Sequence, residues 1–561
     1  MTTPEDKFSI SRIRISGFKK IREPFTLNLN ESSTILVGNN GVGKTTVIEA
    51  VNLALSGRYR DAPIGRCISE YLFNKDEVNE FFDPPNYSRS FPEIQIDIYL
   101  KGGSKSSAAK FSGAYCPEKA KQCGFSFRIA FNPDYLSEVK DTADNNWLDS
   151  LPVEYYEASW MSFAGEKLTP RGLPVTCVLL NPNGDMRPSY GTDRATKSLL
   201  DVLDKEDHLA LSQGARKGKD GFRQSVRNSS VNSKLSDDSN FKVGKVELDV
   251  NIGSADSWYR DLTIALSGVP YENIGAGPQC LLQSEISFGS IAERGERQTI
   301  VLIEEPENHL SYGNLNRLLS LLEEHRGRQF LCTTHSSFVA NKLGLQNLVV
   351  VGTSPSGISS TTLKDLPADT YTFFRKLPGF ETLRLALVEK AILVEGPSDE
   401  LIVQHAYRDK FQSTPLDNGI DVISVGLAFE RFLAIAKHIK KKVAIITDND
   451  GDPNKVAEKY ASYLSENNIQ AFYDPTSHDE PHERYPKLRL DTLEATLVRS
   501  AGREILCTIL SREDADDQSL IHYMETHKTD SALAVFDSEV SIKYPQYITE
   551  AINWIGGPEC P

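Results

Sequence analysis

Apolar and polar positions follow three patterns in the first sixty residues. Apolar side chains alternate with polar ones around Ile13 and Ile15 and again over 25–29, which predicts two strands with one buried face. A continuous apolar run follows at 34–37, and a glycine-rich loop comes after it. Beyond the loop, apolar residues recur at helical spacing until Gly57, a residue type that commonly ends helices. We therefore expect a strand, a loop and a helix in this order.

Further along the chain, the same strand pattern returns in two groups. Apolar strands are predicted at 299–305 and 329–335, with a helical stretch between them. A second alternation of strands and helices begins at 391–396 and repeats at 420–426 and 443–450. Strands that alternate with helices are typical of α/β folds with parallel sheets. The fold class predicted is α/β, with two such units in series.

Composition sets limits on location and partners. The formal charge of −15 argues against non-specific nucleic-acid binding over the whole surface, although it leaves room for a local basic groove. The eight cysteines are scattered without a C-x-x-C pair, which favours a reducing compartment. The start of the chain has no apolar signal core, and no apolar run approaches the roughly eighteen residues of a membrane span. We expect a cytoplasmic protein without a membrane partner.

The loop between the first predicted helix and the strand before it reads GNNGVGKT at 38–45, a complete G-x-x-x-x-G-K-[ST] pattern. Its glycines let backbone N–H groups surround phosphate oxygens, and the helix N-terminus adds partial positive charge. Lys44 would reach the outer phosphates of ATP, and the Thr45 hydroxyl would bind Mg²⁺. The residues predicted to bind nucleotide in this loop are Gly38, Asn39, Asn40, Gly41, Gly43, Lys44, Thr45 and Thr46.

A second part of the nucleotide site is predicted at the end of the strand 299–305. Glu304 would hold the magnesium ion through water, and Glu305 would orient or deprotonate the attacking water. His335 follows the next apolar strand, where it would sense the γ-phosphate. A lone histidine is more often a structural residue, but its place after both motifs favours the sensor role.

The sequences VGNNGVGKTT, LIEEPE and TTHSS resemble the ABC-type ATPases related to RecF and to the structural-maintenance-of-chromosomes heads. That resemblance implies a dimer of heads with two ATP molecules between them, each capped by a signature sequence of the other head. The segment IGAGPQCLL at 274–282 stands where the signature belongs, but it departs from LSGGQ. Glu304 also departs from the family, which commonly has aspartate there. The helical and Ser/Asn-rich stretch 192–242 resembles, by position, a short dimerisation insert.

Acidic residues follow two predicted strands of the C-terminal half. Glu395 ends the apolar run 391–394, and Asp399 lies in the first turn of the next helix. Asp448 and Asp450 follow another apolar run. Because the carboxyl ends of parallel strands share one edge, these four carboxylates would converge and repel one another unless they are protonated or bind cations. Oxygen ligands suit Mg²⁺ or Mn²⁺, so a metal site is predicted.

The Glu-x-x-x-Asp and Asp-x-Asp motifs resemble the TOPRIM fold of topoisomerases, primases and certain nucleases. Two later segments fit the nuclease branch, with Glu494 in LDTLEATLV and Lys528 in HKTDSAL. An ATPase head followed by this TOPRIM arrangement is similar to the overcoming-lysogenization-defect (OLD) family of nucleases, to which the nuclease subunit of the Gabija anti-phage system belongs. Four segments follow from this resemblance: an ATPase part over 1–191, a helical insert that serves as a dimerisation element over 192–242, a second ATPase part over 243–367, and a TOPRIM nuclease domain over 368–561.

The resemblance implies a metal-dependent endonuclease in anti-phage defence, with two ions held by the carboxylates, Glu494 helping the second, and Lys528 stabilising charge on the phosphate. DNA is the favoured substrate, and a homodimer or larger oligomer is expected, with a helicase or another defence subunit as a further partner. Two alternatives stay open: a TOPRIM ribonuclease that cuts tRNA or other RNA, and a RecF-like, ATP-switched repair protein without cleavage. The basic run 437–442 either tracks a phosphate backbone or is an ordinary charged helix end.

Overall fold

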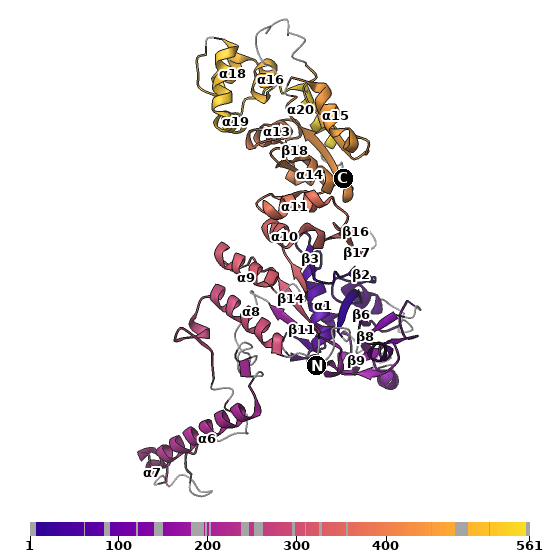
Figure 1. Ribbon diagram of the computed structural model, residues 1–561, viewed down its shortest axis with the longest axis vertical. Helices are drawn as coiled ribbons and strands as arrows, with labels where there is room; N and C mark the ends of the chain where they lie inside the picture. The colour runs from indigo at the N-terminus through magenta and orange to yellow at the C-terminus, as the bar shows by residue number, and fades with distance from the viewer. Residues whose placement is uncertain are drawn as a thin grey trace. The chain divides into compact units, whose positions relative to one another are not determined.

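The structure is a computed structural model of the 561-residue chain (Figure 1). The residues that it describes are 7–60, 62–82, 90–118, 122–139, 150–180, 196, 199–200, 203–236, 246–251, 258, 262–293, 298–308, 310–324, 328–354, 357–449, 451–476, 492–514 and 516–556. The fold is mixed α/β, as predicted. The chain divides into two compact units, one of residues 1–33 and 45–332 and one of residues 34–44 and 333–561.

The first unit contains a seven-stranded antiparallel sheet with the order β10-β9-β8-β6-β1-β2, and with β7 paired to β8. Ile13 and Ile15 are fully buried, and Phe25 and Leu27 are nearly so, which confirms the two alternating strands. The strands of this sheet are β1 (Phe8–Ser16), β2 (Phe25–Asn28), β6 (Ile94–Gly102), β7 (Ser112–Gly113), β8 (Gln122–Phe131), β9 (Tyr156–Ser162) and β10 (Lys167–Leu168).

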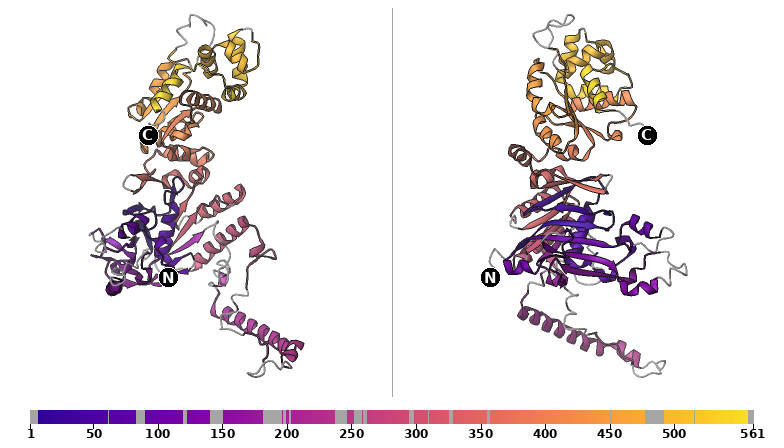
Figure 2. Two further views of the ribbon diagram at one scale, coloured as in Figure 1. Left: turned by 180° about the vertical axis from the view of Figure 1, so that it is seen from behind. Right: turned by 90° about the vertical axis from the view of Figure 1, so that its right-hand side faces the viewer.

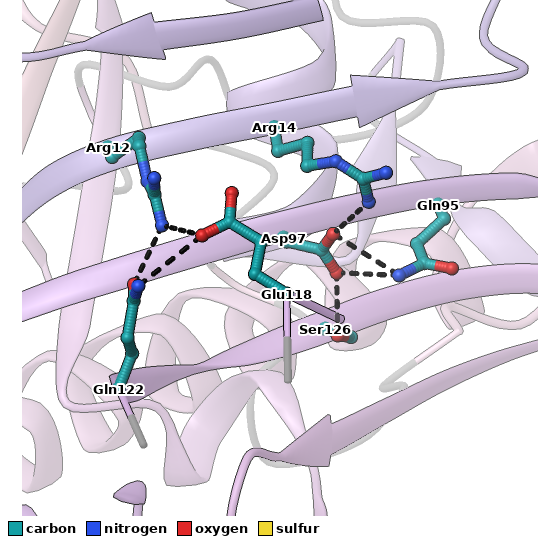
Figure 3. A network of polar contacts seen from close by, with 7 residues as sticks. All are labelled: Arg12, Arg14, Gln95, Asp97, Glu118, Gln122 and Ser126. Carbon is teal, nitrogen blue, oxygen red and sulfur yellow. Dashed lines mark hydrogen bonds and ion pairs between the residues drawn. The ribbon is translucent and has the colours of Figure 1, made fainter. Parts of the chain in front are cut away.

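A buried carboxylate joins three neighbouring strands of this sheet (Figure 3). Asp97 of β6 lies opposite Arg14 of β1 and opposite Ser126 of β8. Its oxygens accept hydrogen bonds from Arg14 Nη1 at 3.2 Å, Ser126 Oγ at 2.6 Å and Gln95 Nε2 at 2.9 Å. The Asp97 side chain is fully buried, so these donors replace the water that it loses. The other residues drawn there make a second group of contacts: Arg12, Glu118 and Gln122.

A second sheet has the strand order β11-β14-β15-β3-β16-β17. Strands β11 and β14 of the first unit pair in parallel, and in the second unit β3 pairs in parallel with β16, whose other neighbour β17 is antiparallel. The predicted strand–loop–helix order is observed, because α1 (Lys44–Ser56) follows β3 and ends one residue before Gly57. The strands are β3 (Ser33–Val37), β11 (Val175–Leu180), β14 (Gln298–Glu304), β15 (Gln329–Thr333), β16 (Leu348–Ser354) and β17 (Gly357–Thr362).

The insert contains helices, as expected from its sequence. Helix α6 (Lys205–Arg227) is one continuous helix, and all of its residues are described, none of them buried (Figure 2). The Ser/Asn-rich part contains α7 (Ser230–Ser236), a short second helix. Residues 237–245 lie outside the described part of the chain.

The C-terminal half contains a four-stranded, wholly parallel sheet with the order β19-β18-β20-β21. The predicted alternation of strands and helices is confirmed here, and apolar residues of the strands form one core with the C-terminal helices. The strands are β18 (Lys390–Val394), β19 (Ile420–Ser424), β20 (Lys442–Ile446) and β21 (Ile469–Phe472). The helices are α13 (Pro397–Phe411), α14 (Phe429–His438), α15 (Pro453–Leu464), α16 (Leu493–Ala501), α17 (Arg503–Ile509), α18 (Asp517–Thr526), α19 (Lys528–Asp537) and α20 (Gln546–Ile555).

The Asp97 network predicts a measurable cost when its charge is removed. Asp97→Asn keeps the shape of the side chain but replaces one acceptor oxygen by an amide, so we expect the first unit to lose about 1–3 kcal/mol of unfolding free energy. Asp134→Asn, which changes an exposed aspartate after β8, is the matched control. Chemical denaturation, with the unfolding of the first unit monitored by limited proteolysis, would measure the unfolding free energy of both variants. Equal stability of the two variants would contradict this prediction.

Candidate functional site

The phosphate loop joins the buried strand β3 to α1, as the sequence pattern predicts. Lys44 is 5% exposed, and its Nζ atom donates hydrogen bonds to the Gly38 carbonyl at 2.9 Å and to the Asn39 carbonyl at 3.1 Å. A Cβ atom at Gly38 would come within 2.3 Å of the Val351 carbonyl oxygen, so only glycine fits there. Gly43 has a φ of +106°, which other residues rarely adopt. The loop conformation therefore depends on its glycines.

The acidic end of β14 lies in the first unit. Burial raises the pKa of Glu304, and a hydrogen bond with the Thr45 side chain opposes this effect. The predicted magnesium ligands Thr45 and Glu304 are thus in contact. Glu305 has a left-handed backbone with a φ of +43°, and its Oε2 accepts a hydrogen bond from Asn308 Nδ2 at 2.6 Å. A non-glycine residue in this conformation is strained, and such strain is often found at functional sites.

The remaining predicted nucleotide residues follow the strands as expected. His335 lies two residues beyond the end of β15 and is partly exposed. The next residue, Ser336, caps α10 (Ser337–Leu343) by accepting a hydrogen bond from the Val339 amide at 3.3 Å. The predicted residues are divided between the units, with Thr45, Thr46, Glu304 and Glu305 in the first, and Gly38, Asn39, Asn40, Gly41, Gly43, Lys44 and His335 in the second.

Two carboxylates of the TOPRIM-like sheet follow its central strand β18. Glu395 is the next residue after the strand, and Gly396 is the N-cap residue of α13. Asp399 lies in the first turn of that helix, where its Oδ2 accepts a hydrogen bond from the Gly396 amide at 3.0 Å. This capping contact holds the Asp399 side chain back toward the strand end. Strand and helix thus present both side chains at the carboxyl edge of the sheet.

The third carboxylate comes from the neighbouring strand. Strand β20 ends at Ile446, so Asp448 lies in the turn after the strand, not on the strand itself. Because β18 and β20 run parallel with Leu393 opposite Ile445, Glu395 and Thr447 reach the same edge. The Thr447 Oγ1 atom donates a hydrogen bond to Glu395 Oε1 at 2.7 Å. Asp450 lies outside the described residues.

Glu494 and Lys528 come from the C-terminal helices. Glu494 lies in the first turn of α16 and is only 3% exposed. Its Oε1 atom lies 3.7 Å from Nζ of Lys528, the first residue of α19, whose side chain is half exposed. Its Oε2 atom is buried and has no hydrogen-bond partner among the residues that the structure describes. A buried carboxylate oxygen without a partner is costly, so this atom is suited to bind a cation.

The pKa values show that these carboxylates face one another. Burial, and then repulsion from Glu395, raise the pKa of Asp399 to about 6. Burial, and then repulsion from Asp399, Glu395 and Glu494, raise the pKa of Asp448 to about 8, while Lys528 opposes this rise. Repulsion follows burial among the causes of both shifts, so these side chains from separate segments lie within electrostatic reach of one another. The structure therefore brings together five of the six residues predicted for the site.

The donor set fits a hard divalent cation, although the side chains are not closed around one. Within the described part of the chain, no three histidine, cysteine or acidic side chains stand close enough to hold a metal ion as they are placed. The raised pKa values of Asp399 and Asp448 and the unpaired oxygen of Glu494 show that a positive charge would be stabilised here. All donors are oxygen atoms, as Mg²⁺ and Mn²⁺ prefer. The residues that could hold such ions are Glu395, Asp399, Asp448 and Glu494.

Sequence reasoning missed two residues that fix the turn carrying Asp448. Thr447 holds Glu395, as described above, but it reads as part of an apolar run. Asn449 is 2% exposed, and its Nδ2 atom donates hydrogen bonds to the carbonyls of Asp474 at 2.6 Å and Thr476 at 2.7 Å. Its Oδ1 atom accepts from the Gly451 amide at 2.8 Å. An asparagine between two aspartates after a strand is the signal that could have indicated this role.

The basic run 437–442 lies at the opposite edge of the sheet, since Lys442 begins β20. Lys442 Nζ donates a hydrogen bond to the Trp554 carbonyl at 2.6 Å, and Lys441 Nζ donates to the Val388 carbonyl. Lys437 forms a 2.9 Å ion pair with Glu466. These contacts support the ordinary interpretation, in which the lysines cap carbonyl oxygens.

In the described residues, no helix is both long and apolar enough to cross a bilayer.

Three family models match parts of the chain. An AAA domain matches residues 12–143, and an AAA domain described as a putative AbiEii toxin of a type IV toxin–antitoxin system matches residues 286–341. The TOPRIM domain of overcoming-lysogenization-defect-like proteins matches residues 387–450, which include Glu395, Asp399 and Asp448. No curated protein matches the sequence.

Solved ATPase heads match about two thirds of the chain. The SMC head domain from Thermotoga maritima is 12% identical and covers 63% of this chain and 98% of its own, with a TM-score of 0.29. An Smc head with an extended coiled coil, bound to the C-terminal domain of ScpA derived from Pyrococcus furiosus, is 14% identical and covers 66% and 99%, with a TM-score of 0.33. The recombination mediator RecF with ATP is 12% identical and covers 63% and 99%, with a TM-score of 0.34.

The matched segments follow a definite order along the chain. AAA ATPase segments precede an OLD-like TOPRIM domain; the phosphate loop lies within the first AAA match, and Glu395, Asp399 and Asp448 lie within the TOPRIM match. With a P-loop ATPase followed by this TOPRIM domain, the chain fits the OLD (overcoming lysogenization defect) family of nucleases.

Proposed function

We propose that the protein is an ATP-binding, divalent-metal-dependent endonuclease that cuts DNA in defence against phage. The observation that carries this proposal is the meeting of four carboxylates and one lysine at the carboxyl edge of a parallel sheet. Glu395, Asp399 and Asp448 come from two strand ends, and Glu494 and Lys528 come from two later helices. This is the edge at which active sites form in open α/β sheets.

The residues of this edge have different proposed roles in metal binding and in catalysis. Glu395, Asp399, Asp448 and Glu494 would hold two divalent ions, and Asp450 completes the proposed set. When bound, such ions activate the attacking water and neutralise the leaving oxygen of a phosphodiester. Thr447 keeps Glu395 oriented through its 2.7 Å hydrogen bond. Lys528 carries a positive charge beside the site and would stabilise the negative charge that develops on the phosphate.

The ATPase part would bind ATP with Mg²⁺. Lys44 would donate to the phosphates; its ammonium group has three N–H donors and contacts the carbonyls of Gly38 and Asn39. Thr45 and Glu304 would hold the magnesium ion, Glu305 would orient the attacking water, and His335 would sense the γ-phosphate. Two copies of the chain would enclose the nucleotides, with the N-terminus of α8 (Ala276–Glu293) in the place of the signature sequence.

Substitution of the carboxylates tests the nuclease proposal. Glu395→Gln and Asp448→Asn remove a negative charge from the proposed metal site, and we expect each to reduce cleavage of plasmid DNA with Mg²⁺ or Mn²⁺ at least about 100-fold. Glu458→Gln, which changes an exposed glutamate on the neighbouring helix α15, should cleave as the wild type does. Binding of Mn²⁺, measured by calorimetry, should weaken in the same two variants.

The substrate assay separates the alternatives. Cleavage of RNA or tRNA in preference to DNA would identify a ribonuclease that uses the same site. DNA binding without any cleavage, in all variants and with either ion, would contradict the nuclease proposal and favour an ATP-switched binding protein.

The raised pKa values predict how stability depends on pH in the absence of divalent ions. An aspartate has an ordinary pKa of about 4, so a folded-state pKa of about 6 for Asp399 and about 8 for Asp448 means that the folded chain holds these protons more tightly than the unfolded chain. This stabilisation is complete at low pH and is lost as the pH rises through about 8. The melting temperature of Asp448→Asn relative to the wild type should therefore increase from pH 5 to pH 8.5.

Thermal melts with a chelator measure this difference, because acid effects common to both proteins cancel. Saturating Mn²⁺ should abolish the advantage of the variant at high pH, since the ion then compensates the carboxylate charge. A melting difference that is constant with pH would contradict the arrangement of the carboxylates.

Helix α6 offers a test of assembly. Leu209 and Phe222 are large apolar residues that are 60% and 62% exposed on this helix, so a partner could bury them. If the insert is a dimerisation element, Phe222→Glu should shift the protein toward the monomer. Tyr71→Glu, at a tyrosine that is 87% exposed elsewhere in the first unit, should not. Sedimentation or light scattering measures the mass, and a dimer unchanged by Phe222→Glu would contradict this role.

A further inference from the structure

A short helix stands immediately before the strand that carries Glu395. Helix α12 (Thr382–Leu387) is followed after two residues by β18, and both belong to the second unit together with the phosphate loop. Three separate groups of polar contacts hold this helix, one at each end and one at its middle. No step of the proposed catalysis requires these contacts, and their positions suggest a different purpose.

The C-terminal end of α12 is held by the phosphate loop. Asn39 Nδ2 donates a hydrogen bond to the Leu387 carbonyl at 3.2 Å. The carbonyl of the same asparagine accepts a hydrogen bond from Lys44 Nζ at 3.1 Å. Asn39 therefore joins α12 to the lysine that would bind an incoming phosphate. A phosphate that competes for the Lys44 ammonium group would weaken its contact with the Asn39 carbonyl, and so loosen the residue that holds Leu387.

The N-terminal end of α12 is held by α10, the helix that follows His335. Ser337 Oγ accepts a hydrogen bond from the Leu383 amide at 3.2 Å. The Thr382 Oγ1 atom donates to Asn341 Oδ1 at 2.7 Å, and both of these side chains are buried. A shift of the strand end at His335 would thus act directly on the first turn of α12.

The middle of α12 is held by elements of the carboxylate edge. Arg384 forms a two-pronged ion pair with Asp421 of β19, with Nε–Oδ2 at 2.8 Å and Nη2–Oδ1 at 2.6 Å. Its Nη2 atom also donates to the Val422 carbonyl at 2.9 Å and to Glu400 Oε1 at 3.2 Å. Glu400 is the neighbour of Asp399 in α13.

The geometry of the Arg384–Asp421 ion pair is fixed by the shape of the two groups that form it. Asp421 is 5% exposed, and its hydrogen bonds with Arg384 raise the pKa of the guanidinium further. A planar guanidinium that binds a carboxylate through two parallel contacts fixes orientation as well as distance. Arg384 therefore sets the positions of β19, which pairs with the strand before Glu395, and of the turn of α13 that carries Asp399.

We propose that Arg384 is a positioning residue of the carboxylate edge, and that α12 transmits the state of the phosphate loop to it. ATP changes the contacts at both ends of α12, and the Arg384–Asp421 pair transfers the resulting shift to the segments that hold Glu395 and Asp399. Nucleotide binding and metal binding are then linked, so that each changes the affinity of the other by the same factor. This proposal rests on ATP binding at the loop and names the regulation of the proposed nuclease site.

Hydrogen exchange on the full-length protein tests this link without requiring cleavage. We expect Mg²⁺ with the slowly hydrolysed analogue ATPγS to change the exchange rates of amides in 421–425 and 399–402 by about 5-fold or more, a factor typical of coupled sites. Arg384→Lys keeps the charge but loses the two-pronged geometry, so this change should disappear while a fluorescent ATP analogue still binds. In Arg384→Lys, any effect of ATPγS on the affinity for Mn²⁺ should disappear as well.

A matched control is available in the same unit. Arg512 pairs with Asp514 through the same two-pronged geometry, at 2.8 Å and 3.0 Å, and has no contact with α12 among the described residues. Arg512→Lys should therefore retain the full response to ATPγS. Ser337→Ala, which removes one contact at the other end of α12, should weaken the response, and it serves as a second variant if Arg384→Lys folds poorly.

Two results would overturn the proposal. One is a wild-type protein in which ATPγS protects the phosphate loop but leaves the exchange of 382–387 and 421–425 unchanged. The other is an Arg384→Lys protein that responds as Arg512→Lys does. Failure of cleavage in every variant, with the exchange response intact, would instead contradict only the nuclease proposal.

Discussion

Repulsion between like charges is the constraint on which the C-terminal half of this protein depends. A parallel sheet brings the ends of neighbouring strands to one edge, and here those ends carry Glu395, Asp399 and Asp448. Burial strengthens the repulsion because less water screens it. Burial itself, and then this repulsion, raise the pKa values of Asp399 and Asp448. The fold tolerates this edge only through protons, through cations, and through the large apolar core beneath it.

The same constraint explains why the surrounding residues are so firmly held. Carboxylates that repel one another would turn outward to solvent if their backbones were free to move. The Gly396 amide holds Asp399, the Thr447 hydroxyl holds Glu395, and the Asn449 side chain fixes the turn beyond Asp448. Side chains held in advance lose little conformational entropy when a ligand arrives. The hydrogen bonds around the site thus convert a source of instability into a preorganised set of oxygen donors.

Much of this site could be predicted from sequence because strand ends are visible in the hydrophobic pattern. Glu395 and Asp448 follow apolar runs, and the rule for parallel strands places both at one edge. Glu494 and Lys528 lie in helices without such a rule, so only the family motif indicated them. Thr447 could not be recognised, because its contact with Glu395 depends on β18 and β20 being neighbours. The local pattern of apolar and polar residues does not reveal the order of strands in a sheet. Arg384 was missed for the same reason, since Asp421 and Glu400 belong to other elements.

The unpaired oxygen of Glu494 has a consequence for the stability of the folded protein as well as for its chemistry. A ligand that binds only the folded chain stabilises it in proportion to the logarithm of its concentration. Glu494 is buried at the start of α16. A counter-charge beside it would therefore stabilise the C-terminal helices, which share one apolar core with the sheet. A divalent cation that binds this oxygen in the folded chain would therefore reduce how often these helices open.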